Sequence, residues 1–172
     1  VGGLTPQRMG NAHMNVVPYQ VFATKDGHIV LAVGNDGQYA RFCELAGRPE
    51  WGRDPRFVEN SGRIGLREVL IPEISRWMLE RSTQEWMDLL EPNAVPCAPI
   101  LTLPGVFKHP QVVARGMKIT LDGDAAGPMP LVANPMRFDG ERAIADRVPP
   151  HIDEHGDAIR AALEAGTGWP KA

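Results

Sequence analysis

The sequence predicts an α+β fold, with a hairpin-containing mixed sheet and packed helices, and three observations predict it. Residues 18–47 show strand, turn, strand and helix signals without a gap. Apolar residues then recur at helical spacing through residues 63–90. Finally, two short apolar runs within residues 117–133 flank a Gly/Asp/Ala turn, a pattern typical of a β-hairpin.

The two strands of the first segment are predicted by different patterns. Residues 19–24 alternate between two faces, as a sheet strand requires. Asp26-Gly27 then supplies a tight turn, since glycine adopts positive φ without steric cost. Residues 29–33 are an unbroken apolar run, which indicates a strand covered on both faces.

A helix follows these strands. Asn35 or Asp36 can cap it, Gly47 ends it, and Pro49 prevents it from continuing. Its apolar stripe consists of Tyr39, Phe42, Cys43 and Ala46. Residues 48–60 form a connector whose aromatic side chains we expect to pin it to the core.

Further helices are expected between residues 63 and 90. Apolar residues recur at helical spacing up to Arg81, but Pro72 removes one N–H donor, so we expect two short helices or a kink there. Ser82 and Glu85 fit a capping box, which marks the start of a new helix.

The remaining elements are shorter. Residues 95–101 contain two prolines and are at best an edge strand or an extended connector. Residues 103–115 resemble two helical turns joined at a proline and closed by Gly116. Beyond Asn134 only residues 154–164 look helical, so this tail buries little by itself.

Composition excludes several classes of function. The 172 residues carry 18 basic and 21 acidic side chains and a formal charge of −3, so no surface is built for nucleic acid or an anionic membrane. No apolar run approaches the ~20 residues of a membrane span. Two cysteines provide no disulfide framework, which suits the cytoplasm. Because the sequence opens on Val1 rather than Met, we expect a fragment of a longer protein.

A polar, glycine-punctuated loop opens the sequence and is the candidate ligand site. Residues 1–17 show neither helical nor strand periodicity. Asn side chains and backbone N–H groups can donate to a carboxylate or thioester oxygen, and His13 adds an imidazole. The alternative is a frayed terminal arm. The candidate substrate-binding residues are Gly10, Asn11, His13, Asn15 and Tyr19.

Two other candidate sites, a cysteine nucleophile and a histidine metal site, are weakly supported by the sequence. Cys97 lacks a nearby cation or helix N-terminus to lower its pKa, so we interpret it as a small buried apolar residue. His151 and His155 have i,i+4 spacing, but Pro149-Pro150 place His151 before the helix. We therefore expect a helix start rather than a metal site, and no permanently bound cofactor.

Several short motifs together resemble the second half of the class III coenzyme A transferases. Their relatives include formyl-CoA transferase, carnitine CoA-transferase and α-methylacyl-CoA racemase. The matching segments, in order, are Gly10-Asn11-x-His13, Pro18-Tyr19-Gln20-x-Phe22-x-Thr24, Asp26-Gly27-x-Ile29, Phe42-Cys43, Gly47-Arg48-Pro49-Glu50, Asp54-Pro55-Arg56-Phe57, Arg63, Val95-Pro96-Cys97-Ala98-Pro99-Ile100, His109-Pro110-Gln111-Val112, Ala114-Arg115-Gly116-Met117, Val132-Ala133-Asn134-Pro135, Pro149-Pro150 and Glu154-His155.

The resemblance implies a domain organisation. Such enzymes are cytoplasmic, intertwined homodimers in which a large nucleotide-fold domain and a smaller α/β domain enclose a CoA thioester substrate. By this resemblance residues 1–17 are an active-site loop, residues 18–124 are the small domain, and residues 125–172 return to a large domain that lies outside this sequence. The loop matches the glycine-rich loop with which formyl-CoA transferase shields its intermediate from water.

The resemblance also implies a chemistry and places its nucleophile elsewhere. In the transferases an aspartate carboxylate attacks the donor thioester, and a carboxylic acid acceptor later takes up the CoA. That aspartate belongs to the first half of the family's proteins, so we assign no catalytic residue to this chain. The aspartates that do not stand in its motif are Asp26, Asp36, Asp54, Asp88, Asp122 and Asp124.

Two alternatives to an acyl-CoA transferase stay open. The racemase branch has a Glu before the proline that matches Pro18, whereas this sequence has Val17, which cannot move a proton. An α-methylacyl-CoA racemase is therefore the second hypothesis. The third is a non-catalytic α+β module used for dimerisation.

Overall fold

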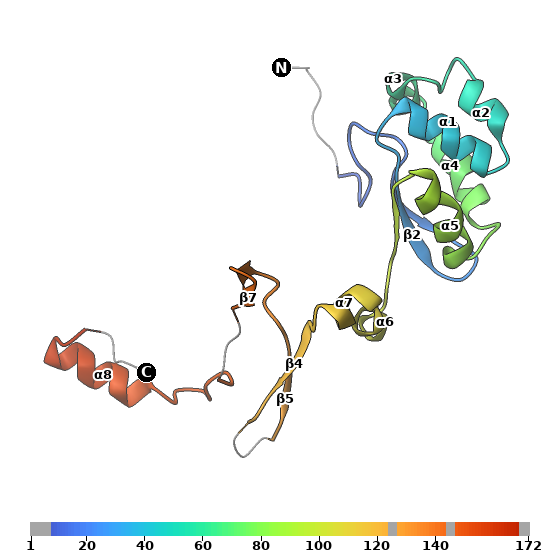
Figure 1. The fold of residues 1–172 in the computed structure, drawn as a ribbon. Coiled ribbons are helices and arrows are strands. Elements are labelled where there is room, and N and C mark those ends of the chain that lie inside the picture. Colours follow the sequence, from blue (N-terminus) through green and yellow to red (C-terminus); the bar gives the residue numbers. More distant parts are fainter. Residues whose placement is uncertain (1–7, 124–126, 144–146, 169–172) are drawn as a thin grey trace. The chain divides into compact units, whose positions relative to one another are not determined.

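The computed structural model describes residues 8–123, 127–143 and 147–168 and divides the chain into two compact units, Val1–Ile100 and Leu101–Ala172 (Figure 1). The first unit contains β1 (Tyr19–Ala23), β2 (His28–Ala32), α1 (Asp36–Leu45), α2 (Pro49–Arg53), α3 (Asn60–Gly65), α4 (Arg67–Met78), α5 (Thr83–Leu90), the 3-10 turn η1 (Glu91–Asn93) and β3 (Cys97–Pro99). The second contains α6 (Leu103–Lys108), α7 (Pro110–Ala114), β4 (Lys118–Leu121), β5 (Met129–Val132), β6 (Arg137–Phe138), β7 (Glu141–Arg142) and α8 (Gly156–Ala165).

The α+β class is confirmed, but all described strand pairs are antiparallel, so the prediction of a mixed sheet is wrong. The sheet of the first unit has the order β1-β2-β3. Ile29 and Leu31 of β2 are fully buried, whereas Val30 and Ala32 are half-buried. The expectation that β2 is covered on both faces is therefore only half correct, because the helices pack against one face of the sheet (Figure 1).

Helix α1 forms as its sequence predicts. The Asn35 side chain accepts a hydrogen bond from the Gln38 N–H at 2.9 Å and so caps the helix. Gly47, with φ +73°, follows its last turn. The stripe of Tyr39, Phe42, Cys43 and Ala46 is buried in the core. The helix thus closes one side of the sheet.

The expected division into two short helices at Pro72 is wrong, and the alternative of a kink there stays a prediction. Helix α4 runs through Pro72, and the interruption lies six residues earlier at Leu66, which has φ −113° and ψ 26° between α3 and α4. Pro72 and Glu68, one turn before it, are both exposed. Water can therefore satisfy the Glu68 carbonyl that the proline leaves without its helical N–H donor.

Residues 48–60 contain helix α2, which the sequence did not predict, but the predicted anchoring by aromatics is confirmed. Trp51 stacks on buried Phe57, with ring centroids 5.2 Å apart, and meets Trp77 edge to face at 5.2 Å. The capping box at the start of α5 is also confirmed, because Ser82 and Glu85 exchange both hydrogen bonds.

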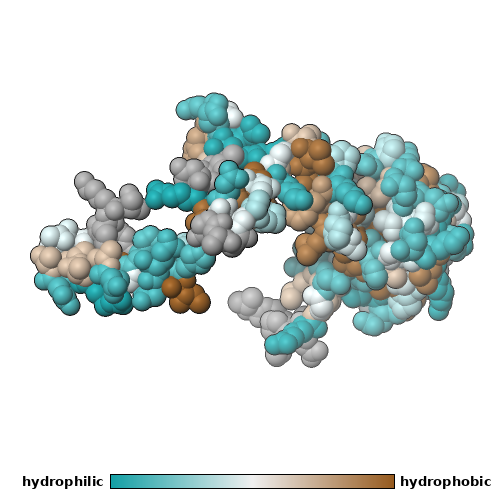
Figure 2. All heavy atoms as spheres, turned by 90° about the horizontal axis from the view of Figure 1, so that it is seen from below, coloured by the Kyte–Doolittle hydropathy of each residue, from teal (hydrophilic) through white to brown (hydrophobic). Residues whose placement is uncertain are grey.

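The second unit is built from short elements with little interior. The predicted hairpin is confirmed as β4 and β5, although residues 124–126 of its turn lie outside the described residues. The β6–β7 hairpin was not predicted, since two-residue polar strands leave no periodic signal. Among the described residues of this unit only Ala133 and Gly156 are buried, and hydrophobic residues reach its surface (Figure 2).

The structure divides the chain after residue 100, where two compact units meet in the sequence. The predicted limits 1–17, 18–124 and 125–172 divide it differently, because they separate the roles that the family resemblance implies. The short edge strand β3 ends the first unit, and α6 opens the second. Helix α8 begins at Gly156 rather than Glu154 and ends before Gly166, which has φ +65°. The proposed return of residues 125–172 to a large domain stays a prediction.

Candidate functional site

The loop of residues 8–17 is the candidate site, and it pairs with the outer edge of β1. The His13 N–H donates to the Tyr19 carbonyl at 2.8 Å, and the Asn11 side chain accepts from the Val21 N–H at 3.0 Å. Tyr19 and Val21 lie at the edge strand of the sheet. The alternative of a frayed arm is therefore wrong for this part of the loop, whereas residues 1–7 lie outside the described residues.

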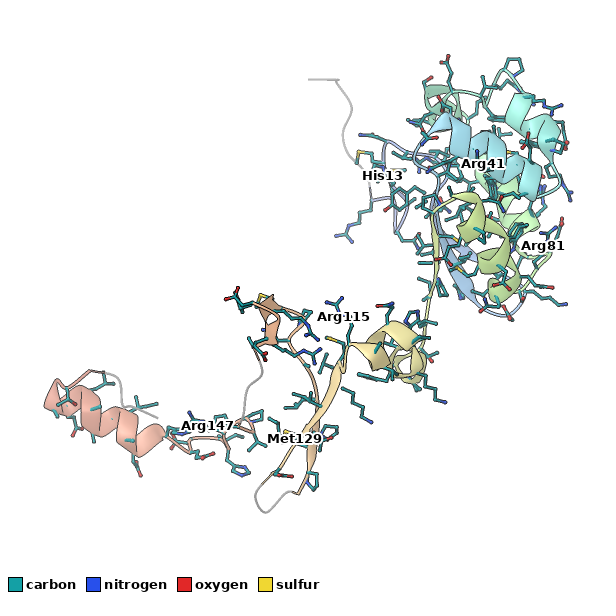
Figure 3. All side chains as sticks on the ribbon, viewed as in Figure 1. His13, Arg41, Arg81, Arg115, Met129 and Arg147 are labelled. Atoms are coloured by element: carbon teal, nitrogen blue, oxygen red, sulfur yellow. The ribbon has the colours of Figure 1, made fainter. Side chains whose placement is uncertain are left out.

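His13 is the most constrained of the predicted site residues. Its ring stacks on that of Tyr19, with centroids 5.2 Å apart and planes 13° from parallel. Its Nδ1 accepts the Asn15 N–H at 3.1 Å. Both rings are nevertheless exposed, and Figure 3 shows His13 on the loop that precedes β1, outside the group of helices. The loop thus presents an ordered imidazole at the surface of the first unit.

Helix α3 holds the loop through Asn60, which the sequence analysis did not single out. The Asn60 side chain accepts the Val17 N–H at 3.1 Å and donates to the Asn15 carbonyl at 2.8 Å. One amide side chain thus bonds the N–H of Val17 and the carbonyl of Asn15, as the backbone of a paired strand would.

Arg63 makes the deepest contact with the loop. Its side chain is fully buried, and its Nε donates to the Val17 carbonyl at 2.7 Å. Its guanidinium lies 4.5 Å from the centre of the Tyr39 ring and forms a 2.8 Å ion pair with Asp36. It also donates to the carbonyls of Phe57 and Val58. The five N–H donors of the planar guanidinium reach these four acceptors at once, one more than the three N–H groups of a lysine could bond.

Arg67 completes this face of the helices. Its Nη2 donates to the carbonyls of His13 and Met14, each at 2.9 Å. Asn60 and Arg63 lie on α3, and Arg67 is the first residue of α4, beyond the interruption at Leu66. In the sequence the three are separated by three and four residues, the spacing of one helix face. That spacing of polar residues in an otherwise amphipathic segment was the signal that could have found them.

The five predicted substrate-binding residues are therefore adjacent. His13 and Tyr19 are joined by the contacts given above, and Asn15 joins them through His13. Asn11 is bonded to Val21, two residues after Tyr19, and Gly10 supplies a φ of +62° in the turn of residues 9–12. All five are exposed. The arrangement offers amide and imidazole groups to a ligand, and their binding to substrate stays a prediction.

Neither cysteine is suited to act as a nucleophile. Burial raises the pKa of the Cys97 thiol to about 11 and that of the Cys43 thiol to about 12. At neutral pH both stay protonated, and the thiolate is the reactive form. The interpretation of Cys97 as a structural residue is consistent with this.

His151 lies before the helix, as predicted, but helix α8 begins only at Gly156. The His151 N–H donates to the Glu154 side chain at 2.7 Å, ahead of helix α8. Within residues 8–123, 127–143 and 147–168, no group of three or more metal-ligating side chains comes together. None of the helices in those ranges is long and apolar enough to cross a membrane.

The sequence matches CoA-transferase family III over residues 1–156. The chain belongs to this family. The resemblance noted from the sequence motifs is thus confirmed, and the match includes the loop, the first unit and most of the second.

Relatives with similar sequences are named as CoA-transferases. The chain is 34% identical over 168 residues to a succinate–glutarate CoA-transferase of Agrobacterium fabrum, covering 95% of this chain and 41% of that protein. It is 32% identical to the human succinyl-CoA:glutarate CoA-transferase, covering 90% of this chain and 35% of that protein. The chain thus spans roughly two fifths of the length of these relatives.

Solved structures have the same fold. A CAIB/BAIF family protein from Brucella suis superposes with a TM-score of 0.72 and 39% identity, over 94% of this chain and 42% of that one. The Mycobacterium tuberculosis protein Rv3272, in an orthorhombic crystal form, gives a TM-score of 0.70 at 27% identity, over 84% of this chain and 41% of that one.

Proposed function

We propose that this chain is the C-terminal part of an acyl-CoA:carboxylate CoA-transferase. It provides the small domain and a substrate-covering loop, while the nucleophilic aspartate lies outside the chain. The observation that carries the proposal is the family match over residues 1–156, together with relatives that transfer CoA between carboxylic acids.

The proposed substrates are a CoA thioester and a carboxylic acid acceptor, with no permanently bound cofactor. Relatives named for succinate, glutarate, oxalate and mesaconate favour dicarboxylic acids. The full-length enzyme is proposed to be a cytoplasmic, intertwined homodimer, as family resemblance implies. Residues 125–172 would return to its large domain, which agrees with the few buried residues of the second unit.

Within this enzyme the loop of residues 8–17 is proposed to cover the reacting thioester. A cover is useful because the acyl intermediates of such a transfer are open to hydrolysis. Asn60, Arg63 and Arg67 support the proposal, since they hold the loop backbone to α3 and α4 in one conformation. Gly10, Asn11, His13, Asn15 and Tyr19 are the proposed contacts to the substrate.

The test is CoA transfer by the full-length protein. With succinyl-CoA and glutarate, we expect glutaryl-CoA and succinate to form, as measured by liquid chromatography and mass spectrometry. Substitution of the upstream aspartate by asparagine is expected to abolish transfer. If no acid yields a new thioester while succinyl-CoA still binds, the transferase proposal is wrong.

The same protein distinguishes the two alternatives. A racemase would exchange the α-proton of a methylacyl-CoA in deuterated water without transferring CoA. The buried side chain at the position of the racemase glutamate is that of Val17, which argues against exchange. A dimerisation module would bind no CoA thioester, which equilibrium dialysis with labelled CoA ester would reveal.

A further inference from the structure

The loop holds His13 so that one ring nitrogen, Nε2, is left for a ligand. The His13 N–H is bound to the Tyr19 carbonyl, and the ring face lies on the Tyr19 ring. The His13 carbonyl accepts from Arg67 Nη2 at 2.9 Å. The residue is thus fixed through its N–H, its carbonyl and one ring face, yet its side chain is exposed.

The hydrogen bond to Nδ1 also fixes which nitrogen donates. The Asn15 N–H donates to His13 Nδ1 at 3.1 Å, so Nδ1 is the acceptor. A neutral imidazole has one acceptor and one donor nitrogen, and Nε2 therefore carries the proton. No residue of the part of the chain that the structure describes accepts a hydrogen bond from Nε2. His13 thus offers one oriented N–H outward.

The charges around this N–H favour an anion as its partner. Residues 8–24 contain no aspartate or glutamate. The guanidinium of Arg67 is bonded to the His13 carbonyl, and it adds positive charge on that side of the loop. A neutral N–H donor beside a cation favours an acceptor that is negatively charged, since hydrogen bonds to ionised groups are the stronger ones.

We propose that His13 Nε2–H binds the carboxylate of a dicarboxylic acyl group that does not take part in the transfer. The proposal rests on the proposed function. In a succinyl or glutaryl thioester one carboxyl carbon is bound to sulfur and the other carboxylate is free and charged. His13 is then a specificity-determining residue, which makes a dicarboxylic acid a better acceptor than a monocarboxylic acid of equal length.

Competition between two acceptors tests this in the full-length protein. Succinyl-CoA is supplied with equal glutarate and pentanoate, and the initial ratio of glutaryl-CoA to pentanoyl-CoA is measured. Both acids compete for the same enzyme-bound thioester, so the product ratio gives the ratio of their kcat/KM values and is independent of the donor. The wild-type protein is expected to favour glutarate.

Three variants separate the contribution of the N–H from that of the ring. His13→Phe keeps a ring on Tyr19 and removes the donor, so the ratio should fall by about ten- to a hundredfold, the usual effect of losing one hydrogen bond to a charged group. His13→Gln retains an N–H donor and should give an intermediate ratio. His28→Phe changes an exposed histidine on β2 and should leave the ratio unchanged.

The outcomes are distinguishable. An unchanged ratio in His13→Phe, with transfer intact, overturns the proposal, as does a wild-type protein without preference for glutarate. An equal loss on both acceptors in folded His13→Phe and His13→Gln also overturns it, because His13 would then serve the reaction rather than the choice of acid. If the wild-type protein forms no new thioester at all, the proposed function fails and this proposal fails with it.

Discussion

Arg63 shows how one buried side chain can organise a surface loop. Its guanidinium satisfies the carbonyls of Val17 and Phe57 in the interior, and its ion-pair partner Asp36 is half-exposed. A buried carbonyl that loses its donor costs about 1–3 kcal/mol. The loop and the core therefore share one set of hydrogen bonds, and a change at Arg63 affects both.

Replacing Arg63 by Met is expected to lower the free energy of unfolding by about 3 kcal/mol or more, because several buried carbonyls lose their donor together. Urea unfolding followed by tryptophan fluorescence measures this. Arg76→Met is the matched control, since Arg76 lies on α4 with a largely exposed side chain, and it should cost less than about 1 kcal/mol. Equal losses in both variants would contradict the role given to Arg63.

Both thiols are expected to resist alkylation in the folded protein. At pH 8, iodoacetamide should modify Cys43 and Cys97 only slowly, since burial raises the pKa of these thiols to about 12 and about 11. Peptide mapping by mass spectrometry, with urea-unfolded protein as the control, checks this. Rapid modification of native Cys97 would reopen the nucleophile hypothesis.

The same thiols link stability to alkaline pH. An unfolded cysteine loses its proton near pH 8.5, whereas the folded thiols keep theirs. Unfolding therefore releases protons in the range from about pH 9 to pH 12, so this contribution to stability decreases as the pH rises through that range.

At the scale of elements, helix α3 packs closely against the backbone of the preceding connector, residues 48–60. A Cβ placed on Gly62 would lie 2.3 Å from the Arg56 carbonyl oxygen, which is backbone and cannot rotate away. A Cβ on Gly65, in the same helix, would meet nothing within 4 Å. Only the first glycine is required by packing.

Gly62→Ala is thus expected to lower the free energy of unfolding by roughly 2 kcal/mol, within the usual cost of overpacking. Gly65→Ala should have no cost or a small gain, because alanine favours helix over glycine. Thermal unfolding of the two variants side by side measures the difference. Equal unfolding temperatures would show that α3 can shift away from Arg56.

The hairpin turn is joined to the start of α5 through Asp26. Its carboxylate accepts the Thr83 N–H at 2.8 Å, and this bond is the main cause that lowers the pKa of Asp26 below its ordinary value of 3.8. The capping box likewise lowers the pKa of Glu85. Their contribution to stability is present above about pH 4.5 and decreases as the pH falls through the lowered values.

Asp26→Asn is expected to weaken this acid dependence, because the amide cannot titrate. Unfolding free energies measured from pH 6 down to pH 3 should decline less steeply in the variant than in the wild-type protein. Glu68→Gln, at an exposed position on α4, serves as the control and should keep the wild-type slope. If the unfolding free energy of Asp26→Asn falls with pH in parallel with that of the wild-type protein, Asp26 is not a source of the acid dependence.

Local rules predicted most elements of the first unit and missed what depends on tertiary contacts. The Asn35 cap, the capping box at Ser82 and the alternation of β1 are local, and all three are present. Pro72 was overvalued as a helix breaker because its solvent exposure is not visible in the sequence. Sequence motifs pointed to the loop, but its anchoring by Asn60 and Arg67 involves partners more than 40 residues away.

At the scale of the whole molecule, we expect the 172-residue chain alone to have no transferase activity. The nucleophilic aspartate is proposed to lie outside this chain, and the relatives that the chain matches are more than twice as long. Incubation of the purified chain with succinyl-CoA and glutarate, followed by mass spectrometry, tests this. The full-length protein is the positive control, and turnover by the chain that survives substitution of the loop residues would contradict the proposed division of roles.

The pairing of the loop with β1 has a consequence for association between molecules. An uncovered edge strand presents unpaired backbone groups that invite another strand to add to the sheet. Asn11 accepts from the Val21 N–H, and the His13 N–H donates to the Tyr19 carbonyl, so these edge groups are already paired. At the opposite edge, prolines in and beside β3 remove N–H donors. A protein shortened to begin after His13 would leave this edge strand unpaired, so we expect the loop of residues 8–17 to protect the sheet against aggregation as well.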